Sequence, residues 1–130
     1  MSEKKNVLII DDDPNIRMLL EFVLGRHYNV IAQEDGMDGM SWLCEGNVPD
    51  LIIADVNMPR IDGYEFLKGI RESGFFRDIP IVMLSGHENA EIKNKCLERG
   101  ANDYCIKPFN PEEILEKIGL VLNQQPAAHI

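Results

Sequence analysis

Short unbroken runs of apolar residues alternate along this chain with longer segments in which apolar residues return every third or fourth position. Two of the runs, residues 7–10 and 51–54, consist of Val, Leu, Ile and Ala alone. Runs this short, bounded by turn residues, are typical of strands covered on both faces of a parallel sheet. Together with three weaker runs, at residues 28–33, 79–84 and 103–106, they predict five strands.

The segments between these strands have the spacing of amphipathic helices. The first begins at Pro14, which suits the first turn of a helix, with Asp13 as N-cap and Gly25 at the end. The last begins with Asn110 as N-cap and Pro111 at the first helical position. The five predicted helices lie between residues 14 and 25, 37 and 46, 64 and 73, 92 and 99, and 111 and 122.

The alternation of five strands with five helices defines the fold class. Such an order requires parallel pairing with right-handed crossovers, which gives a doubly wound α/β sandwich. The chain has 130 residues, of which 45% are hydrophobic, enough for one domain with a buried core. We therefore predict a single domain at residues 1–122 and a loose C-terminal tail at residues 123–130.

Composition and charge narrow the function classes. Thirteen basic and 22 acidic residues give a net charge of −9, which would repel nucleic-acid phosphates and anionic membrane surfaces. No apolar segment approaches the roughly 20 residues of a membrane span, and residues 1–6 do not resemble a signal peptide. Cys44, Cys96 and Cys105 lack the spacing of a zinc site, so we expect free thiols. These features predict a cytoplasmic protein that binds neither nucleic acid nor membrane directly.

Polar residues stand at the ends of four of the predicted strands. Asp11 and Asp12 follow the first strand, Asp55 the third, Ser85 the fourth and Lys107 the fifth. Because parallel strands share one carboxyl edge, where open α/β folds place their ligand sites, these side chains should converge there. Asp55 ends a strand that is apolar throughout, and it is the leading candidate for the reactive residue.

Three carboxylates at one edge predict a metal site. Each close pair repels by roughly 4 kcal/mol at an effective dielectric of about 20, and a hard divalent cation relieves this repulsion. Mg²⁺ suits one or two carboxylates, a backbone carbonyl after Asp55, and a phosphoryl oxygen. With Mg²⁺ and the ammonium of Lys107 the pocket becomes nearly neutral, so that a phosphoryl group can enter. A carboxylate nucleophile in such a pocket can form an acyl phosphate.

These residues resemble the motifs of the response-regulator receiver domain. The motifs are Asp11-Asp12, the segment Asp55-x-x-Met58-Pro59-x-x-Asp62-Gly63, Ser85, Tyr104 and Lys107-Pro108. They occur in the family's order and spacing, and the resemblance covers residues 4–122. It implies a domain of two-component signal transduction with a flavodoxin-like sheet in the strand order 2-1-3-4-5.

The resemblance also implies a role for each site residue. Asp55 receives a phosphoryl group from a histidine kinase or a phosphotransfer protein, and Ser85 and Lys107 hold phosphoryl oxygens. The implied Mg²⁺ ligands are Asp11, Asp12, Asp55 and the carbonyl of Asn57. Apart from catalysing its own phosphorylation and dephosphorylation, such a domain is not an enzyme.

A conformational switch is implied as well. On phosphorylation Ser85 moves toward the phosphoryl group, and Tyr104 turns from solvent into the vacated space. The fourth helix, fifth strand and fifth helix then form a changed face on which an effector domain, a target protein or a second copy of the chain docks. The residues expected on this face are Lys93, Lys95, Glu98, Tyr104 and Glu113.

The resemblance places specificity toward the kinase in the first helix. The residues expected to carry it are Ile16, Arg17, Leu20 and Leu24. The output is open, since both a stand-alone regulator and a receiver belonging to a longer protein fit the sequence. His87, after the fourth strand, is a weak candidate for an influence on hydrolysis.

Two dipeptides have local structural interpretations. Asp62-Gly63 is interpreted as a turn, with Gly63 chosen for its backbone freedom. The Lys107-Pro108 peptide bond is a candidate for the cis form.

Three other functions fit the pattern less well. A phosphohydrolase of the haloacid-dehalogenase type would use residues 11–13 as its nucleophile motif, but it needs Thr or Val where this chain has Asn15, and a later acidic pair. A flavodoxin-like electron carrier needs hydroxyl and amide groups beside the flavin phosphate, and three aspartates would repel it. A receiver-like domain that has lost phosphorylation would lack reactive positions, and all of them are filled here.

Overall fold

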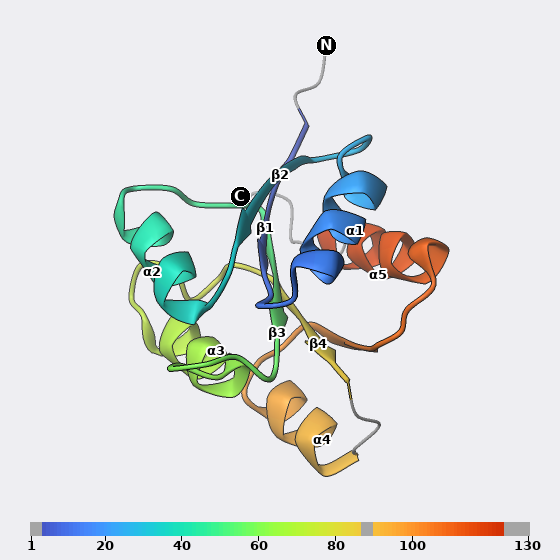
Figure 1. Cartoon of the computed structure of the whole chain (residues 1–130). Helices are drawn as coiled ribbons and strands as arrows, with labels where there is room; N and C mark the ends of the chain where they lie inside the picture. Colours follow the sequence, from blue (N-terminus) through green and yellow to red (C-terminus); the bar gives the residue numbers. More distant parts are fainter. Residues whose placement is uncertain (1–3, 87–89, 124–130) are drawn as a thin grey trace.

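The computed structural model describes residues 4–86 and 90–123, which form strands and helices in strict alternation (Figure 1). The elements are β1 (Asn6–Ile10), α1 (Pro14–Leu24), β2 (Asn29–Gln33), α2 (Gly36–Cys44), β3 (Leu51–Asp55), α3 (Gly63–Glu72), β4 (Ile81–Ser85), α4 (Ala90–Glu98), β5 (Asp103–Ile106) and α5 (Pro111–Asn123). Their order confirms the predicted α/β fold class.

All neighbouring strands pair in parallel, in the order β2-β1-β3-β4-β5. This is the flavodoxin-like order that the sequence predicted. In the register of the central strands Ile10 lies beside Ala54, and Asp55 lies beside Leu84. β1, β3 and β4 therefore end at nearly the same level, and the residues that follow them emerge at one edge of the sheet.

Helices cover both faces of the sheet (Figure 1). On one face α2, α3 and α4 pack through buried residues that include Leu43, Phe66 and Cys96. On the other face α1 and α5 pack through residues that include Leu20 and Ile114. The sheet therefore separates two hydrophobic clusters.

The two clusters explain why the central strands are apolar without alternation. Along β1, Leu8 and Ile10 belong to the cluster under α2, α3 and α4, whereas Val7 and Ile9 belong to the cluster under α1 and α5. Successive side chains of a strand point to opposite faces, so a strand buried on both faces needs an apolar residue at every position.

Two strand boundaries differ from the prediction. β2 begins at Asn29 and not at residue 28, and β4 runs from Ile81 to Ser85 and not over residues 79–84. Pro80 has no N–H to donate to the sheet, and the N–H of Ile79 donates to the Phe76 carbonyl at 3.1 Å within a turn. β4 thus starts two residues later than predicted and ends one residue later, at Ser85.

The last helix extends one residue into the predicted tail, because α5 ends at Asn123. The remaining tail residues, 124–130, lie outside the described residues, and so does His87. Within the described ranges no helix is both long enough and apolar enough to cross a membrane.

Gly63 is required by a close approach and not by the freedom of a turn. Its N–H donates to the Val56 carbonyl at 2.7 Å, and a Cβ atom at this position would lie 2.1 Å from the Asp55 carbonyl oxygen. Asp62 is the N-cap of α3, and its side chain accepts from the N–H of Glu65 at 2.8 Å. The predicted turn is therefore the start of a helix, and α3 begins in contact with the end of β3.

A pocket of about 320 Å³ lies at the opposite, amino edge of the sheet. It is lined by Lys4, Lys5, His27, Tyr28, Gly119, Leu122 and Asn123. Residues from the start and from the end of the described chain thus meet at one place.

Candidate functional site at the carboxyl edge

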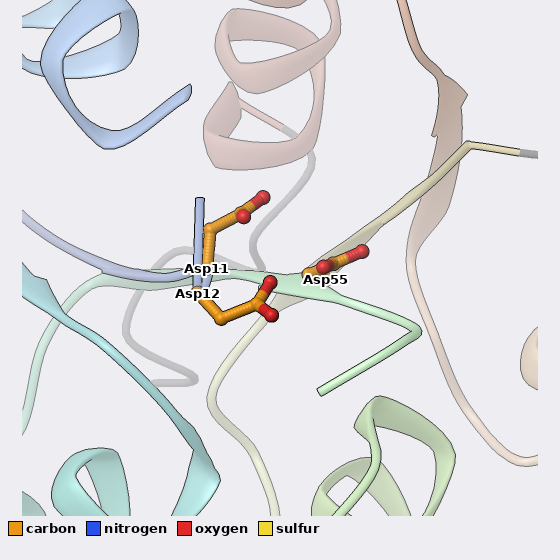
Figure 2. Close-up of side chains that lie close together, drawn as sticks. All are labelled: Asp11, Asp12 and Asp55. Carbon is orange, nitrogen blue, oxygen red and sulfur yellow. The ribbon is translucent and has the colours of Figure 1, made fainter. Parts of the chain in front are cut away.

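The candidate site lies where β1 and β3 end. Asp11 and Asp12 follow β1, and Asp55 is the last residue of β3. Each residue offers one carboxylate oxygen, and these oxygens all lie within 4.8 Å of one another. Figure 2 shows the three side chains at the strand ends, with their carboxylates close together. The structure thus brings together the three carboxylates that the sequence placed at this edge.

The three carboxylates differ in exposure. Asp11 and Asp55 are 0% and 4% exposed, whereas Asp12 is exposed to solvent. The Asp11 side chain accepts from the N–H of Asp13 at 2.9 Å, which holds the turn after β1. The site therefore consists of a buried pair of carboxylates that is open to solvent at Asp12.

Lys107, directly after β5, supplies a positive charge. Its Nζ lies 2.8 Å from Asp11 Oδ2 and 3.4 Å from Asp55 Oδ1. Its backbone N–H donates to the Ser85 carbonyl at 2.7 Å, and the Lys107-Pro108 peptide bond is cis, as the sequence indicated. One ammonium against three carboxylates leaves an excess of negative charge.

Burial and crowding change the titration of the site. Burial, together with the charge of Asp11, raises the pKa of Asp55 to about 6 against the opposing effect of Lys107. Burial lowers the pKa of Lys107, but its 2.8 Å contact with Asp11 and the charges of Asp55 and Asp11 outweigh the effect of burial, so that this pKa is raised overall. Burial is the larger cause of the Asp55 shift, and the repulsion from Asp11 that adds to it is the part that a bound cation would relieve.

The donor set fits a small, hard divalent cation. Asp11 Oδ2 is buried and accepts no hydrogen bond from the described residues, since its contact with Lys107 is a charge contact outside hydrogen-bond geometry. The N–H of Asn57 lies 3.4 Å from Asp55 Oδ1, so the backbone after β3 also turns toward the carboxylates. Oxygen atoms of this kind are the ligands that Mg²⁺ and Ca²⁺ prefer.

Ser85 belongs to the same edge. It is fully buried as the last residue of β4, and it lies one residue beyond Leu84, the register partner of Asp55. On its other side Ser85 pairs with Ile106, the residue before Lys107. The end of β4 therefore lies between Asp55 and Lys107 along the sheet.

Tyr104 differs from the expectation. Its side chain is buried, at 4% exposure, in the cluster that contains Met83 and Cys96, and its hydroxyl has no hydrogen-bond partner among the described residues. The prediction of a ring in solvent is therefore wrong for this structure. The alternation along β5 directs Tyr104 to the face covered by α4, where the ring packs against apolar neighbours.

The exposed surface of α1 also differs from the prediction. Leu20 and Leu24 are fully buried against the sheet and do not reach a partner. Met18 and Phe22, one turn apart, are instead 66% and 70% exposed. The guanidinium of Arg26 lies 5.7 Å from the centroid of the Phe22 ring.

Lys95 points away from β5. Its Nζ lies 4.2 Å from the centroid of the Tyr64 ring on α3. Lys95, Tyr64 and Asn57 help to line a pocket of about 180 Å³ between α3 and α4. Lys95 therefore lines this pocket with its ammonium over Tyr64.

Two arginines that sequence reasoning did not select for the carboxylate site contact its loops. Arg17 Nη1 donates to the Asp11 carbonyl at 2.8 Å, and Arg60, in the loop after β3, forms an ion pair with Asp35. The place of Arg17 in the first turn of α1 was a usable signal, because a long side chain there reaches back to the preceding loop. Arg60 and Asp35 are 25 positions apart, and nothing in the local pattern joins them.

Fold and site define a class of protein: a doubly wound α/β domain with three carboxylates and one lysine at the carboxyl edge of its sheet. The family model described as the response regulator receiver domain matches residues 7–119. The chain therefore belongs to the response regulator receiver domain family, the receiver domains of two-component signalling.

Relatives and solved structures agree with this assignment. The chain is 36% identical to the alkaline phosphatase synthesis transcriptional regulatory protein PhoP of Bacillus subtilis, over 95% of this chain and 51% of PhoP. It is 31% identical to the hybrid signal transduction histidine kinase D of Dictyostelium discoideum, over 95% of this chain and 8% of the kinase. The chemotaxis protein CheY4 of Vibrio cholerae superposes with a TM-score of 0.84 at 33% identity, covering 92% of this chain and 99% of CheY4. The chain spans about half the length of regulators such as PhoP.

Proposed function

We propose that Asp55 accepts a phosphoryl group from a histidine kinase or a phosphotransfer protein in a Mg²⁺-dependent reaction. The observation that carries this proposal is the position of Asp55, a buried carboxylate at the end of β3 with Lys107 3.4 Å away and two further carboxylates beside it. Membership of the receiver family supports the same reaction class.

The transfer follows from the groups around Asp55. An oxygen of the ionised carboxylate forms the new bond to phosphorus, and the bond from phosphorus to the donor's histidine nitrogen breaks, with the electron pair staying on nitrogen. Lys107 and the Ser85 hydroxyl hold phosphoryl oxygens and orient the group. Mg²⁺, when bound, offsets the charge of the carboxylates and of the phosphoryl oxygens. Attack of water on the acyl phosphate returns Asp55 and releases phosphate.

The metal ligands in this proposal are Asp11, Asp12, Asp55 and the carbonyl of Asn57. Asp12 is exposed and forms no ion pair with the described residues, so it is the carboxylate most free to bind the ion directly. Asp11 already contacts Lys107, and a water-mediated contact with the ion suits it better.

Two surfaces suit the partners of this reaction. α1 begins three residues after Asp11, and its exposed pair Met18 and Phe22 offers an apolar contact to a kinase or phosphotransfer protein. The face formed by α4, β5 and α5 is proposed for the effector domain, the target protein or a second copy of the chain. Its exposed residues include Lys93, Glu98, Glu113, Leu97 and Leu120.

Intact mass spectrometry tests the central claim. After incubation with a small acyl phosphate and Mg²⁺, the chain should gain one phosphoryl group, and excess EDTA should prevent the gain. Asp55→Asn should take up none, whereas Asp78→Asn, which changes an exposed carboxylate away from the site, should be labelled normally. Labelling of Asp55→Asn at the wild-type rate would disprove the assignment.

A further inference from the structure

Two loops frame the proposed metal site. Residues 11–13 after β1 include Asp11 and Asp12, and residues 56–62 follow Asp55 at the end of β3. The loop after β1 is tied to the turn between β2 and α2. Arg17 Nη1 donates to the Asp11 carbonyl at 2.8 Å, and Arg17 Nη2 lies 3.7 Å from Glu34 Oε1. The side chain of Arg17 is 18% exposed and that of Glu34 is 72% exposed, so the ion pair starts from a half-buried guanidinium and ends at the surface.

The loop after β3 is tied to the next residue of the same turn. The Arg60 guanidinium donates to Asp35 Oδ2, while Asp35 Oδ1 caps α2 by accepting from the N–H of Asp38 at 2.9 Å. Asp35 is 6% exposed. One buried carboxylate therefore serves two elements, with one oxygen for each.

Backbone geometry supports this link. Arg60 has a φ of 69°, in the left-handed region, which a residue with a side chain adopts at a cost. Such a conformation persists where surrounding contacts hold it, and the ion pair with Asp35 is a contact of that kind. The turn and the loop also pack directly, because a Cβ atom on Gly36 would lie 3.3 Å from the Ile61 carbonyl oxygen.

We propose that Glu34 and Asp35 act as a brace between the two metal-binding loops, and that Arg60 and Asp35 are positioning residues for the divalent cation. This inference rests on the proposed function, because it assumes that the ion binds at Asp11, Asp12 and Asp55. The brace fixes the loop that carries the Asn57 carbonyl relative to the two aspartates after β1. Its loss should leave the ligands in place but less well aligned.

Simple electrostatics predicts a different result for the same substitutions. Removing the positive charge of Arg60 should strengthen cation binding, and removing the negative charge of Asp35 should weaken it. The brace predicts weaker binding for both changes. The sign of the Arg60 effect therefore separates positioning from charge.

The experiment uses Arg60→Asn and Asp35→Asn. Asn tolerates the left-handed conformation at position 60 and remains an effective N-cap at position 35, so each variant removes the ion pair with little other damage. Calorimetric titration with Mg²⁺ should give a dissociation constant about 3- to 10-fold higher for each variant, as for lost outer-shell partners of metal ligands. The double variant should be no weaker than the weaker single variant, because both changes remove one interaction.

A readout without metal completes the test. Hydrogen exchange of the backbone N–H groups of Asn57, Met58 and Ile61 should be faster in both variants, because the loop loses its contact with Asp35. Arg99→Gln, which removes the ion pair with Glu72 away from the site, is the matched control and should change neither measurement.

The outcomes separate the two proposals. Tighter binding by Arg60→Asn, or dissociation constants within twofold of wild type for both variants, would overturn the brace. Unchanged amide exchange in both variants would also overturn it and leave the proposed function intact. A wild-type chain that binds no Mg²⁺ would overturn the proposed function, and with it the role of the brace in metal binding.

Discussion

At the scale of single residues, the titration of Asp55 has a consequence for stability. Its pKa is raised from 3.8 to about 6 in the folded chain, chiefly by burial. The folded chain therefore binds a proton at Asp55 more tightly than the unfolded chain does. Below about pH 4 Asp55 is protonated in both states, and the difference in pKa does not reduce stability. As the pH rises from about 4 through 6, the folded chain must lose a proton that it binds more tightly, and the free energy of unfolding falls by about 1–3 kcal/mol.

Asp55→Asn should accordingly be more stable than wild type, by about 1–3 kcal/mol at pH 7.5 and by much less at pH 4, when no divalent ion is present. Urea unfolding in EDTA at both pH values measures this difference. Added Mg²⁺ should stabilise the wild type and have little effect on Asp55→Asn. A gain of equal size at both pH values would show that the substitution changes packing instead of removing a charge.

Single residues also mark where prediction from the sequence succeeds. Asp11, Asp12 and Asp55 could be placed together because strand ends in a parallel sheet meet at one edge. The burial of Tyr104 and of Leu20 could not be predicted as reliably, because it depends on which face of an element meets its neighbour. A residue's place along an element is easier to infer than the direction of its side chain.

At the scale of elements, Arg71 joins α3 to its neighbours. Its Nε donates to the Gly100 carbonyl at 2.9 Å, and its Nη2 donates to Asn102 Oδ1 at 3.0 Å. Its Nη1 donates to the carbonyls of Ile79 at 2.7 Å and of Arg77 at 2.9 Å. The same oxygen of Asn102 accepts from the N–H of Ile81 at 2.9 Å. The start of β4 and the turn after α4 thus depend on one guanidinium.

Arg71→Lys should lower the free energy of unfolding by about 2–4 kcal/mol, because a single ammonium group does not reach all four acceptors. Urea unfolding followed by circular dichroism measures the loss. Arg77→Lys, at an exposed position in the same region, is the control and should change stability little. A loss below about 0.5 kcal/mol for Arg71→Lys would mean that the acceptors of Arg71 find other partners.

The boundaries of elements were predicted less well than their order. Ile79 and Pro80 continue the apolar run of β4 in the sequence, yet the N–H of Ile79 closes a turn with Phe76 and Pro80 has no N–H to donate, so that β4 begins at Ile81. Apolar character reports burial, and it does not distinguish a buried turn from the first residues of a strand.

At the scale of the whole molecule, the buried Tyr104 bears on how phosphorylation would be read. Its hydroxyl has no partner among the described residues, and burying such a group costs roughly 1–3 kcal/mol. A rearrangement of the end of β4 that offers a partner to this hydroxyl would recover part of that free energy. A phosphoryl group on Asp55 adds charge and acceptor oxygens beside Ser85, which is where such a rearrangement would begin.

Beryllofluoride with Mg²⁺, which mimics an acyl phosphate, should therefore change the chemical shifts of Tyr104 and of its neighbours on α4 and β5. A change in self-association should accompany the shifts if a second copy docks on this face, and ultracentrifugation measures it. Asp55→Asn with the same additions is the control and should show neither change. Shifts confined to the residues around Asp55, with no change in self-association, would exclude this face as the output.

The pocket at the amino edge bears on how this domain can be combined with others. Lys4 and Lys5 near the start, and Asn123 at the end of α5, line one pocket on the far side of the sheet from Asp55. A domain joined close to residue 4 or to residue 123 would lie at the amino edge, and the acidic edge would stay free for docking. Because both ends of the described chain lie at this edge, the domain can be inserted into a longer chain with both connections on the side away from Asp55.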